Sequence, residues 1–123
     1  MRRVPSGERH HGLMMRPLLV LVLAQRLYHV VPLPKVAVSQ QTHIETCGQV
    51  VYVRKQLDGD WHITLAIGAA KVVAEIIPLI PLEPPPKGAW VTVRGIRRFD
   101  DEHKWYEINP VESWVLAAKG CAS

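Results

Sequence analysis

The stretch that decides the fold is DGDWHITLAI, residues 58–67. Its Asp58-Gly59 pair is a strong β-hairpin signal, because glycine readily adopts the positive φ angles that tight turns need. After this turn, large apolar residues occupy every second position: Trp61, Ile63, Leu65 and Ile67. A period of two is typical of a strand with one buried face. We therefore predict a half-buried strand over residues 61–67, entered through a hairpin.

Similar β-rich runs lie on both sides of this strand. Residues 43–55 precede it, and residues 71–77, 90–94 and 103–114 follow it. The first run contains Gly48, where a glycine within a strand indicates a bulge or a sharp bend. Glu75 is the one carboxylate in the third run, and we expect it to face solvent or a polar partner. Five short strands separated by turn residues favour a small all-β domain.

The links between these runs predict the topology. Residues 78–88 contain five prolines, which exclude a helix or an interior strand and indicate an extended connection. We expect Gly95 to end the fourth strand and residues 96–102 to form a polar hairpin loop. A meander of three strands, a long link and a hairpin make the OB (oligonucleotide/oligosaccharide-binding) topology. The prediction is a five-stranded OB-type barrel over residues 43–115, with a proline-rich connector in place of the usual helix and a tail at 116–123.

The 123 residues suffice for one domain. Charge is distributed unevenly along them. The formal net charge is +4, yet residues 1–42 carry six Lys or Arg against one acid, and residues 43–123 carry nine against ten. The predicted barrel is therefore close to neutral. The net positive charge of the whole chain is no argument for nucleic-acid binding by the barrel, since that charge lies in residues 1–42.

The leader itself, residues 1–42, has two interpretations. An apolar run at 17–24 follows Met14, Met15 and Arg16, and it is too short for a membrane span. Residues 14–24 match a signal peptide, or else they form a core strand or helix. The chain is accordingly cytoplasmic, or exported to the periplasm or beyond, with no integral membrane span. Pro32 and Pro34 favour a linker or an edge segment over residues 25–41.

The two cysteines, Cys47 and Cys121, are expected to be ordinary thiols. Export would allow them to pair, and the closed loop would then stabilise the fold by about 4 kcal/mol. The sequence contains no Cys/His spacing typical of structural zinc.

Four segments together resemble a group of small, mostly uncharacterised bacterial OB-fold-like domains with DGDxHxxL and HxxxExxPV-type strands. The matching residues are Gly48-x-Val50, 58–65, 74–78 and 103–111. The resemblance covers residues 43–115 and implies the fold rather than a function. Asn109 stands where that group often has a second histidine, so a metal site does not carry over.

The leading hypothesis for function is single-stranded nucleic-acid binding, in which aromatic side chains stack on bases and cations follow the phosphates. The candidate residues are Tyr52, Arg54, Lys55, Trp90, Arg94, Arg97, Arg98, Lys104 and Trp105. A structural alternative is that Trp61 and Trp90 fill the interior of the barrel and contact no ligand. The alternative function is an exported domain that binds a saccharide, a peptide or a protein.

A second candidate is a polar site made by Asp58, Asp60, His62, His103 and Glu107. Two histidines with carboxylates could bind a metal or perform acid/base chemistry. The structural alternative is that Asp58 and Asp60 shape the turn while His62 and Glu107 form a polar pair. No short-range metal motif supports a bound ion, so we predict a binding protein rather than an enzyme, without a metal or cofactor. The oligomeric state stays open.

Overall fold

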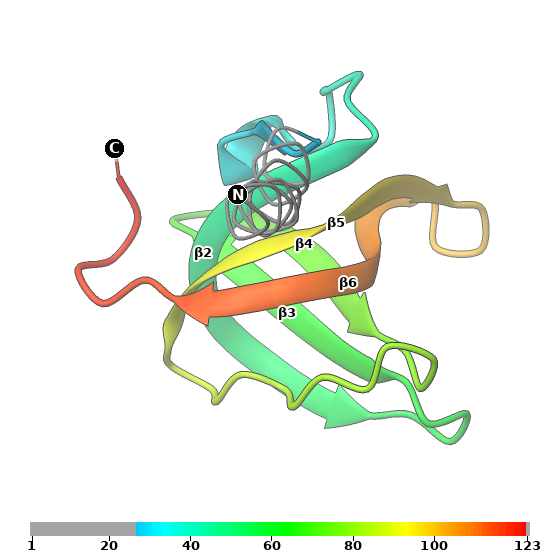
Figure 1. Ribbon diagram of the computed structural model, residues 1–123. Helices are drawn as coiled ribbons and strands as arrows, with labels where there is room; N and C mark the ends of the chain where they lie inside the picture. The colour runs from blue at the N-terminus through cyan, green and yellow to red at the C-terminus, as the bar shows by residue number, and fades with distance from the viewer. Residues whose placement is uncertain (1–26, 123) are drawn as a thin grey trace, which may run out of the picture.

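A computed structural model describes residues 27–122. Five long strands form a closed barrel, and a short strand and one 3-10 turn precede them (Figure 1). The elements are β1 (His29–Val30), η1 (Leu33–Lys35), β2 (His43–Lys55), β3 (Trp61–Ile67), β4 (Ala70–Ile76), β5 (Trp90–Asp100) and β6 (Trp105–Leu116). The strand order is β1-β2-β3-β4-β6-β5, and pairing of β2 with β5 closes the barrel. The predicted all-β, OB-type fold is confirmed.

Strand β2 bends so that it belongs to both halves of the barrel. Its first half pairs with β5 and its second half pairs with β3, with Gln49 in both ladders. Gly48 lies at this crossing, where a Cβ atom would come within 3.1 Å of the Cβ of Leu65. A register shift follows between Val50 and Tyr52. The bend expected at Gly48 is therefore present, and a bulge follows it.

The core lies inside the barrel and is built by the alternation seen in the sequence. Ile63 and Leu65 of β3 are buried, and Trp61 and Ile67 pack against the same cluster. The segment before the barrel also contributes apolar side chains to it: Val31, Leu33 and Val36. Strand β1 pairs in parallel with the start of β2. The possible signal segment, residues 14–24, lies outside the described residues.

The β5–β6 hairpin is longer than expected. Strand β5 continues through Gly95 to Asp100, so the prediction of a loop over residues 96–102 is wrong. At Gly95 the two strands approach closely, since a Cβ would lie 2.4 Å from the carbonyl oxygen of Pro110. The turn contains only residues 101–104, and Asp100 Oδ1 accepts hydrogen bonds from the backbone N–H groups of Glu102 and His103.

Two further contacts tie segments outside the strands to the barrel. Cys47 and Cys121 form a disulfide, so the expectation of two thiols is wrong. The proline-rich connector between β4 and β5 contains no helix or strand, as predicted, and the Trp114 indole donates a hydrogen bond of 2.7 Å to the Glu83 carbonyl. Within residues 27–122, no helix is long and apolar enough to cross a membrane.

Candidate ligand-binding groove and polar cluster

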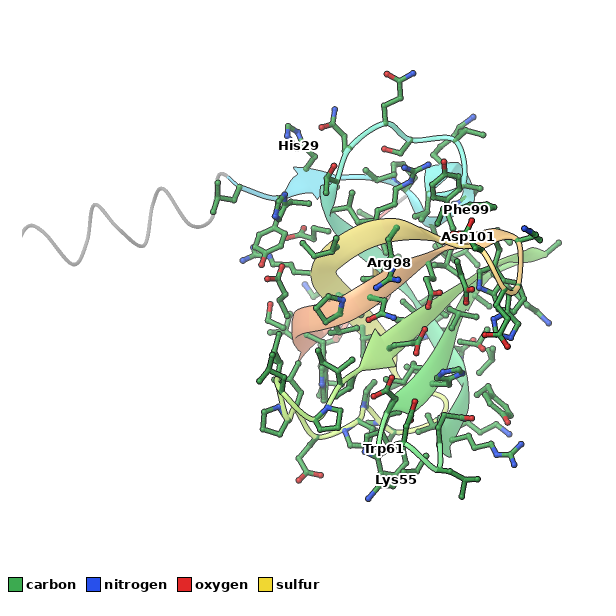
Figure 2. The ribbon with its side chains drawn as sticks, turned by 90° about the vertical axis from the view of Figure 1, so that its right-hand side faces the viewer. His29, Lys55, Trp61, Arg98, Phe99 and Asp101 are labelled. Atoms are coloured by element: carbon green, nitrogen blue, oxygen red, sulfur yellow. A yellow bond between two sulfur atoms is a disulfide. The ribbon has the colours of Figure 1, made fainter. Side chains whose placement is uncertain are left out.

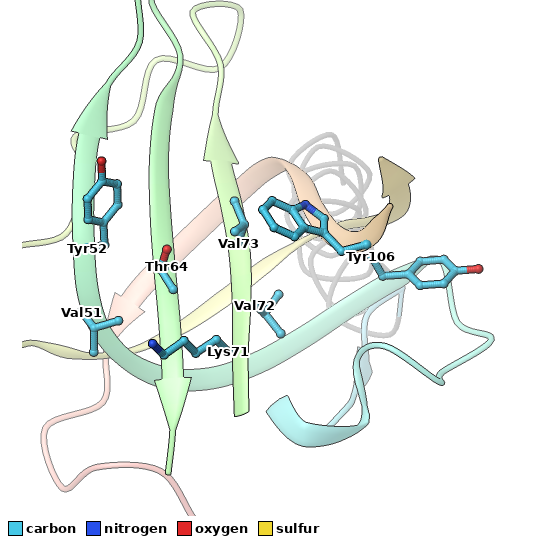
Figure 3. A pocket seen from close by; sticks show the side chains of 8 residues that line it. Val51, Tyr52, Thr64, Lys71, Val72, Val73 and Tyr106 are labelled. Atoms are coloured by element: carbon cyan, nitrogen blue, oxygen red, sulfur yellow. The ribbon is translucent and has the colours of Figure 1, made fainter. Parts of the chain in front are cut away.

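A groove of about 610 Å³ lies on the outer face of β2, β3 and β4, and the start of β6 forms its far wall (Figure 3). Its lining is mainly apolar and aromatic. The lining residues are Val51, Tyr52, Thr64, Lys71, Val72, Val73, Trp105 and Tyr106. In OB folds, this sheet face and the loops at its edges are where oligonucleotides and oligosaccharides bind.

Strand register and the bulge in β2 build the groove. Tyr52 pairs with Thr64, and Thr64 pairs with Val73, so the three side chains lie side by side across the strands (Figure 3). The register shift at Val51 adds one residue to β2, and both Val51 and Tyr52 line the groove. A bulge commonly redirects a side chain in this way.

The aromatic residues of the groove are partly exposed and held by neighbours. The exposed fractions are 44% for Tyr52, 43% for Trp105 and 37% for Tyr106. The Trp105 ring stacks on His103 with centroids 4.7 Å apart and planes 6° from parallel. The Tyr106 ring makes an edge contact with Phe99, and the Arg97 guanidinium lies 3.7 Å from its centroid. These contacts position the Trp105 and Tyr106 rings before any ligand arrives.

Three exposed cations accompany the groove. Lys71 lines it, Arg54 follows Tyr52 by two residues on the same strand, and Lys104 directly precedes Trp105. Of the nine residues proposed for nucleic-acid contact, Tyr52 and Trp105 line the groove, and Arg54 and Lys104 are their neighbours in the chain.

The other five candidates lie elsewhere or have other partners. Trp90 lines a different depression, beside the C-terminal tail. Arg94 forms an ion pair of 2.8 Å with Glu45. Arg97 donates to the carbonyl oxygens that follow η1. Lys55 lies over the Trp61 ring at the lower end of the molecule, well below the labelled Arg98 in Figure 2.

A polar cluster continues the same sheet face beyond the groove. His62 and Glu75 are paired across β3 and β4, and His62 Nε2 lies 2.9 Å from Glu75 Oε1. Asn109 of β6 donates to the other carboxylate oxygen of Glu75 at 3.1 Å. The partner of His62 is therefore Glu75, and not Glu107 as the structural alternative supposed.

The hairpin brings two more acids to this cluster. Asp100 Oδ2 lies 2.7 Å from His103 Nδ1, and this hydrogen bond holds the pKa of Asp100 far below its usual range and raises the pKa of His103. Glu107 is only 2% exposed. Burial, followed by the neighbouring acids Glu75 and Asp100, raises the pKa of Glu107 to about 9.

Of the five residues proposed for the polar site, three belong to this cluster: His62, His103 and Glu107. Asp60 lies at its margin, where burial raises the pKa of its carboxyl, with further contributions from Asp58 and Glu75. Asp58 accepts a hydrogen bond from the Asp60 N–H and shapes the turn, as expected.

Sequence reasoning did not include Glu75, Asp100 and Asn109 in the site. The signal for Glu75 was a single carboxylate within an apolar strand. Such a residue is rarely buried without a polar partner.

No protein-family model and no curated protein matches the chain. Solved structures do share its architecture. The asparaginyl-tRNA synthetase of Entamoeba histolytica, known alone and with asparaginyl-adenylate, aligns at 14% identity and a TM-score of 0.58, over 76% of this chain and 24% of the synthetase. A protein described as an aspartyl-tRNA synthetase from Leishmania major Friedlin aligns at 13% identity and a TM-score of 0.57, over 72% and 20%. The chain thus spans less than a quarter of these enzymes, and the similarity establishes the OB-type fold.

Proposed function

We propose that the groove binds a short stretch of single-stranded nucleic acid. The observation that carries this proposal is the position of three partly exposed aromatic rings, Tyr52, Trp105 and Tyr106, around one groove on the β2–β4 face. OB folds bind oligonucleotides on this face. The solved structures of similar fold are an asparaginyl-tRNA and an aspartyl-tRNA synthetase, which is in keeping with a nucleic-acid ligand.

The groove offers both kinds of contact that single strands require. An aromatic side chain that stacks on a base contributes about 1–3 kcal/mol, and it does so for any base, because every base has a π face. Lys71, Arg54 and Lys104 provide three positive charges for the phosphates. Since three cations are few, we expect modest affinity with little sequence preference.

A fluorescence titration of the full chain with a short oligothymidylate tests this proposal. With three phosphate contacts, the slope of log K against log salt is about −2, which weakens binding by roughly 20-fold between 50 and 200 mM salt. Trp105→Ala removes one stacking surface and weakens binding by about 5- to 150-fold.

Trp90→Ala is the matched control, because Trp90 is a similarly exposed tryptophan outside the groove. We expect its affinity to equal that of the wild type. Binding that has no salt slope, or that Trp90→Ala weakens more than Trp105→Ala, would contradict the proposal.

The disulfide favours a second candidate, an exported domain that binds a saccharide, peptide or protein through the same groove. Disulfides persist in oxidising compartments such as the periplasm, and they are rare in the cytosol. The Cys47–Cys121 bond is therefore the specific observation in its support. Titration with neutral oligosaccharides separates the two candidates. Binding that is insensitive to salt and lost in Trp105→Ala would support this second candidate over the first.

A further inference from the structure

Three carboxylates from three strands converge beside the groove. They are Glu75 of β4, Asp100 at the end of β5 and Glu107 of β6, and one oxygen from each lies within 4.8 Å of the others. Glu75 and Glu107 are buried, at 8% and 2% exposure, and Asp100 is half-buried. Like charges this close in a poorly hydrated place repel strongly unless one carboxyl takes up a proton or a positive charge lies among them.

The protein itself supplies little of that charge. Within residues 27–122, no lysine or arginine forms an ion pair with any of the three carboxylates. Arg98 is the register partner of Glu107, but its side chain is exposed and forms no ion pair. The nearest partners are two imidazoles, His62 on Glu75 and His103 on Asp100, which lie on the outer side of the cluster.

Glu107 provides a second and independent observation. Its Oε2 atom is enclosed and has no hydrogen-bond partner among the described residues. The Glu107 carboxyl faces Glu75 and Asp100, which cannot donate a hydrogen bond when they are ionised. Buried polar atoms are almost always satisfied by protein, by water or by an ion, so this oxygen needs either a proton that it shares with Glu75 or Asp100 or a bound cation.

The other two carboxylates are already oriented by neighbours. Glu75 is held by His62 Nε2 at 2.9 Å and Asn109 Nδ2 at 3.1 Å. Asp100 is held by His103 Nδ1 at 2.7 Å and by two backbone N–H groups of the hairpin turn. Hydrogen bonds of this kind fix metal-binding carboxylates in place and leave a lone pair on each for the ion.

We propose that Glu75, Asp100 and Glu107 form a binding site for one divalent cation. Three carboxylates are the ligands that Mg²⁺, Mn²⁺ and Ca²⁺ prefer, and water would complete the coordination. The site contains no thiolate, and its imidazoles already bond the carboxylates, so its chemistry differs from that of a zinc site. The inference does not depend on nucleic-acid binding.

Mn²⁺ is the probe, because its unbound form is counted directly by electron paramagnetic resonance. The full chain, first treated with a chelator, is expected to bind Mn²⁺ saturably at this site, and Mg²⁺ or Ca²⁺ is expected to compete. Glu107→Gln keeps the size of the side chain and removes its charge, and it is expected to weaken binding at least tenfold. Asp101→Asn is the matched control, since Asp101 is exposed in the same hairpin and lies outside the cluster.

Circular dichroism establishes that each variant is folded, and Asp100→Asn replaces Glu107→Gln if the latter does not fold. Mn²⁺ is also expected to raise the thermal midpoint of the wild type and of Asp101→Asn, but not that of the cluster variant. Two results would overturn the proposal. One is the absence of saturable binding to the wild type, which would mean that a proton on Glu107 alone relieves the crowding. The other is equal affinity of Glu107→Gln and Asp101→Asn, which would place the ion elsewhere.

Discussion

Substitution of Gly95 by alanine tests the close approach of β5 and β6 at this residue. The added Cβ would lie 2.4 Å from the Pro110 carbonyl oxygen, 2.7 Å from Ile108 Cγ2 and 3.1 Å from the Val111 Cα. The first distance is roughly 1 Å short of an ordinary contact. Two of these three atoms belong to the backbone, so the strands must move apart, because a change of side-chain rotamer cannot relieve the overlap.

The expected cost follows from two opposing effects. Overpacking in a filled interior typically costs about 1–3 kcal/mol, and a clash with backbone belongs at the upper end. The replacement also restricts the unfolded chain, which returns about 0.4–1 kcal/mol. We therefore expect Gly95→Ala to lower the free energy of unfolding by about 2 kcal/mol, and the thermal midpoint by roughly 8–16 °C.

Urea unfolding followed by tryptophan fluorescence measures this loss. Gly48→Ala is the matched control, since it is also a mid-strand glycine, and its nearest contact is the Leu65 Cβ at 3.1 Å. We expect the control to lose less than about 1 kcal/mol, because that neighbour needs to shift by only a few tenths of an ångström. If Gly95→Ala unfolds at the same urea concentration as Gly48→Ala, the argument from close approach is refuted.

Two further predictions concern contacts between distant parts of the chain. Replacing Cys47 and Cys121 together by serine opens a loop with a sequence separation of 74, and the chain-entropy relation gives a loss of about 4.5 kcal/mol. Urea unfolding of the double variant and of the wild type, the latter with and without a reductant, measures this loss. Equal urea midpoints for the oxidised wild type and the variant would contradict the estimate. Arg97→Ala removes hydrogen bonds to the carbonyls of Val36 and Ala37 and is expected to destabilise the protein by about 2 kcal/mol. A loss below about 0.5 kcal/mol in the same assay would show that these bonds are dispensable.

The strands with regular alternation could be predicted from sequence, and the hairpin could not. Residues 61–67 place an apolar side chain on one face at every second position, so period and burial agree. Beyond Gly95 the alternation of apolar and polar residues stops, because Arg97 and Arg98 are consecutive and indicate a polar loop. Arg97 nevertheless stays in a strand, since its guanidinium reaches carbonyl oxygens some 60 residues away. No local pattern contains that contact.

The groove was only partly predictable, because some of its residues carry a local signal and others do not. Tyr52 and Trp105 were candidates because aromatic residues on an OB barrel suggest stacking. Lys71 and Val73 were missed, since nothing in their own strand distinguishes them until the hairpin lies alongside it. The carboxylate cluster needs three strands to be placed at once, and sequence reasoning had joined His62 to Glu107 rather than to Glu75.

The short β5–β6 turn connects the carboxylate cluster to the groove. Asp100 belongs to the carboxylate cluster and Trp105 to the wall of the groove, yet the two residues face each other in the strand ladder and are separated by only four turn residues. His103 joins them directly, because it bonds Asp100 and stacks on Trp105. A ligand that shifts the hairpin at either place therefore changes the geometry at the other. Such coupling is reciprocal. If an ion bound in the cluster changes the affinity of the groove for its ligand by some factor, the ligand changes the affinity of the cluster for the ion by the same factor.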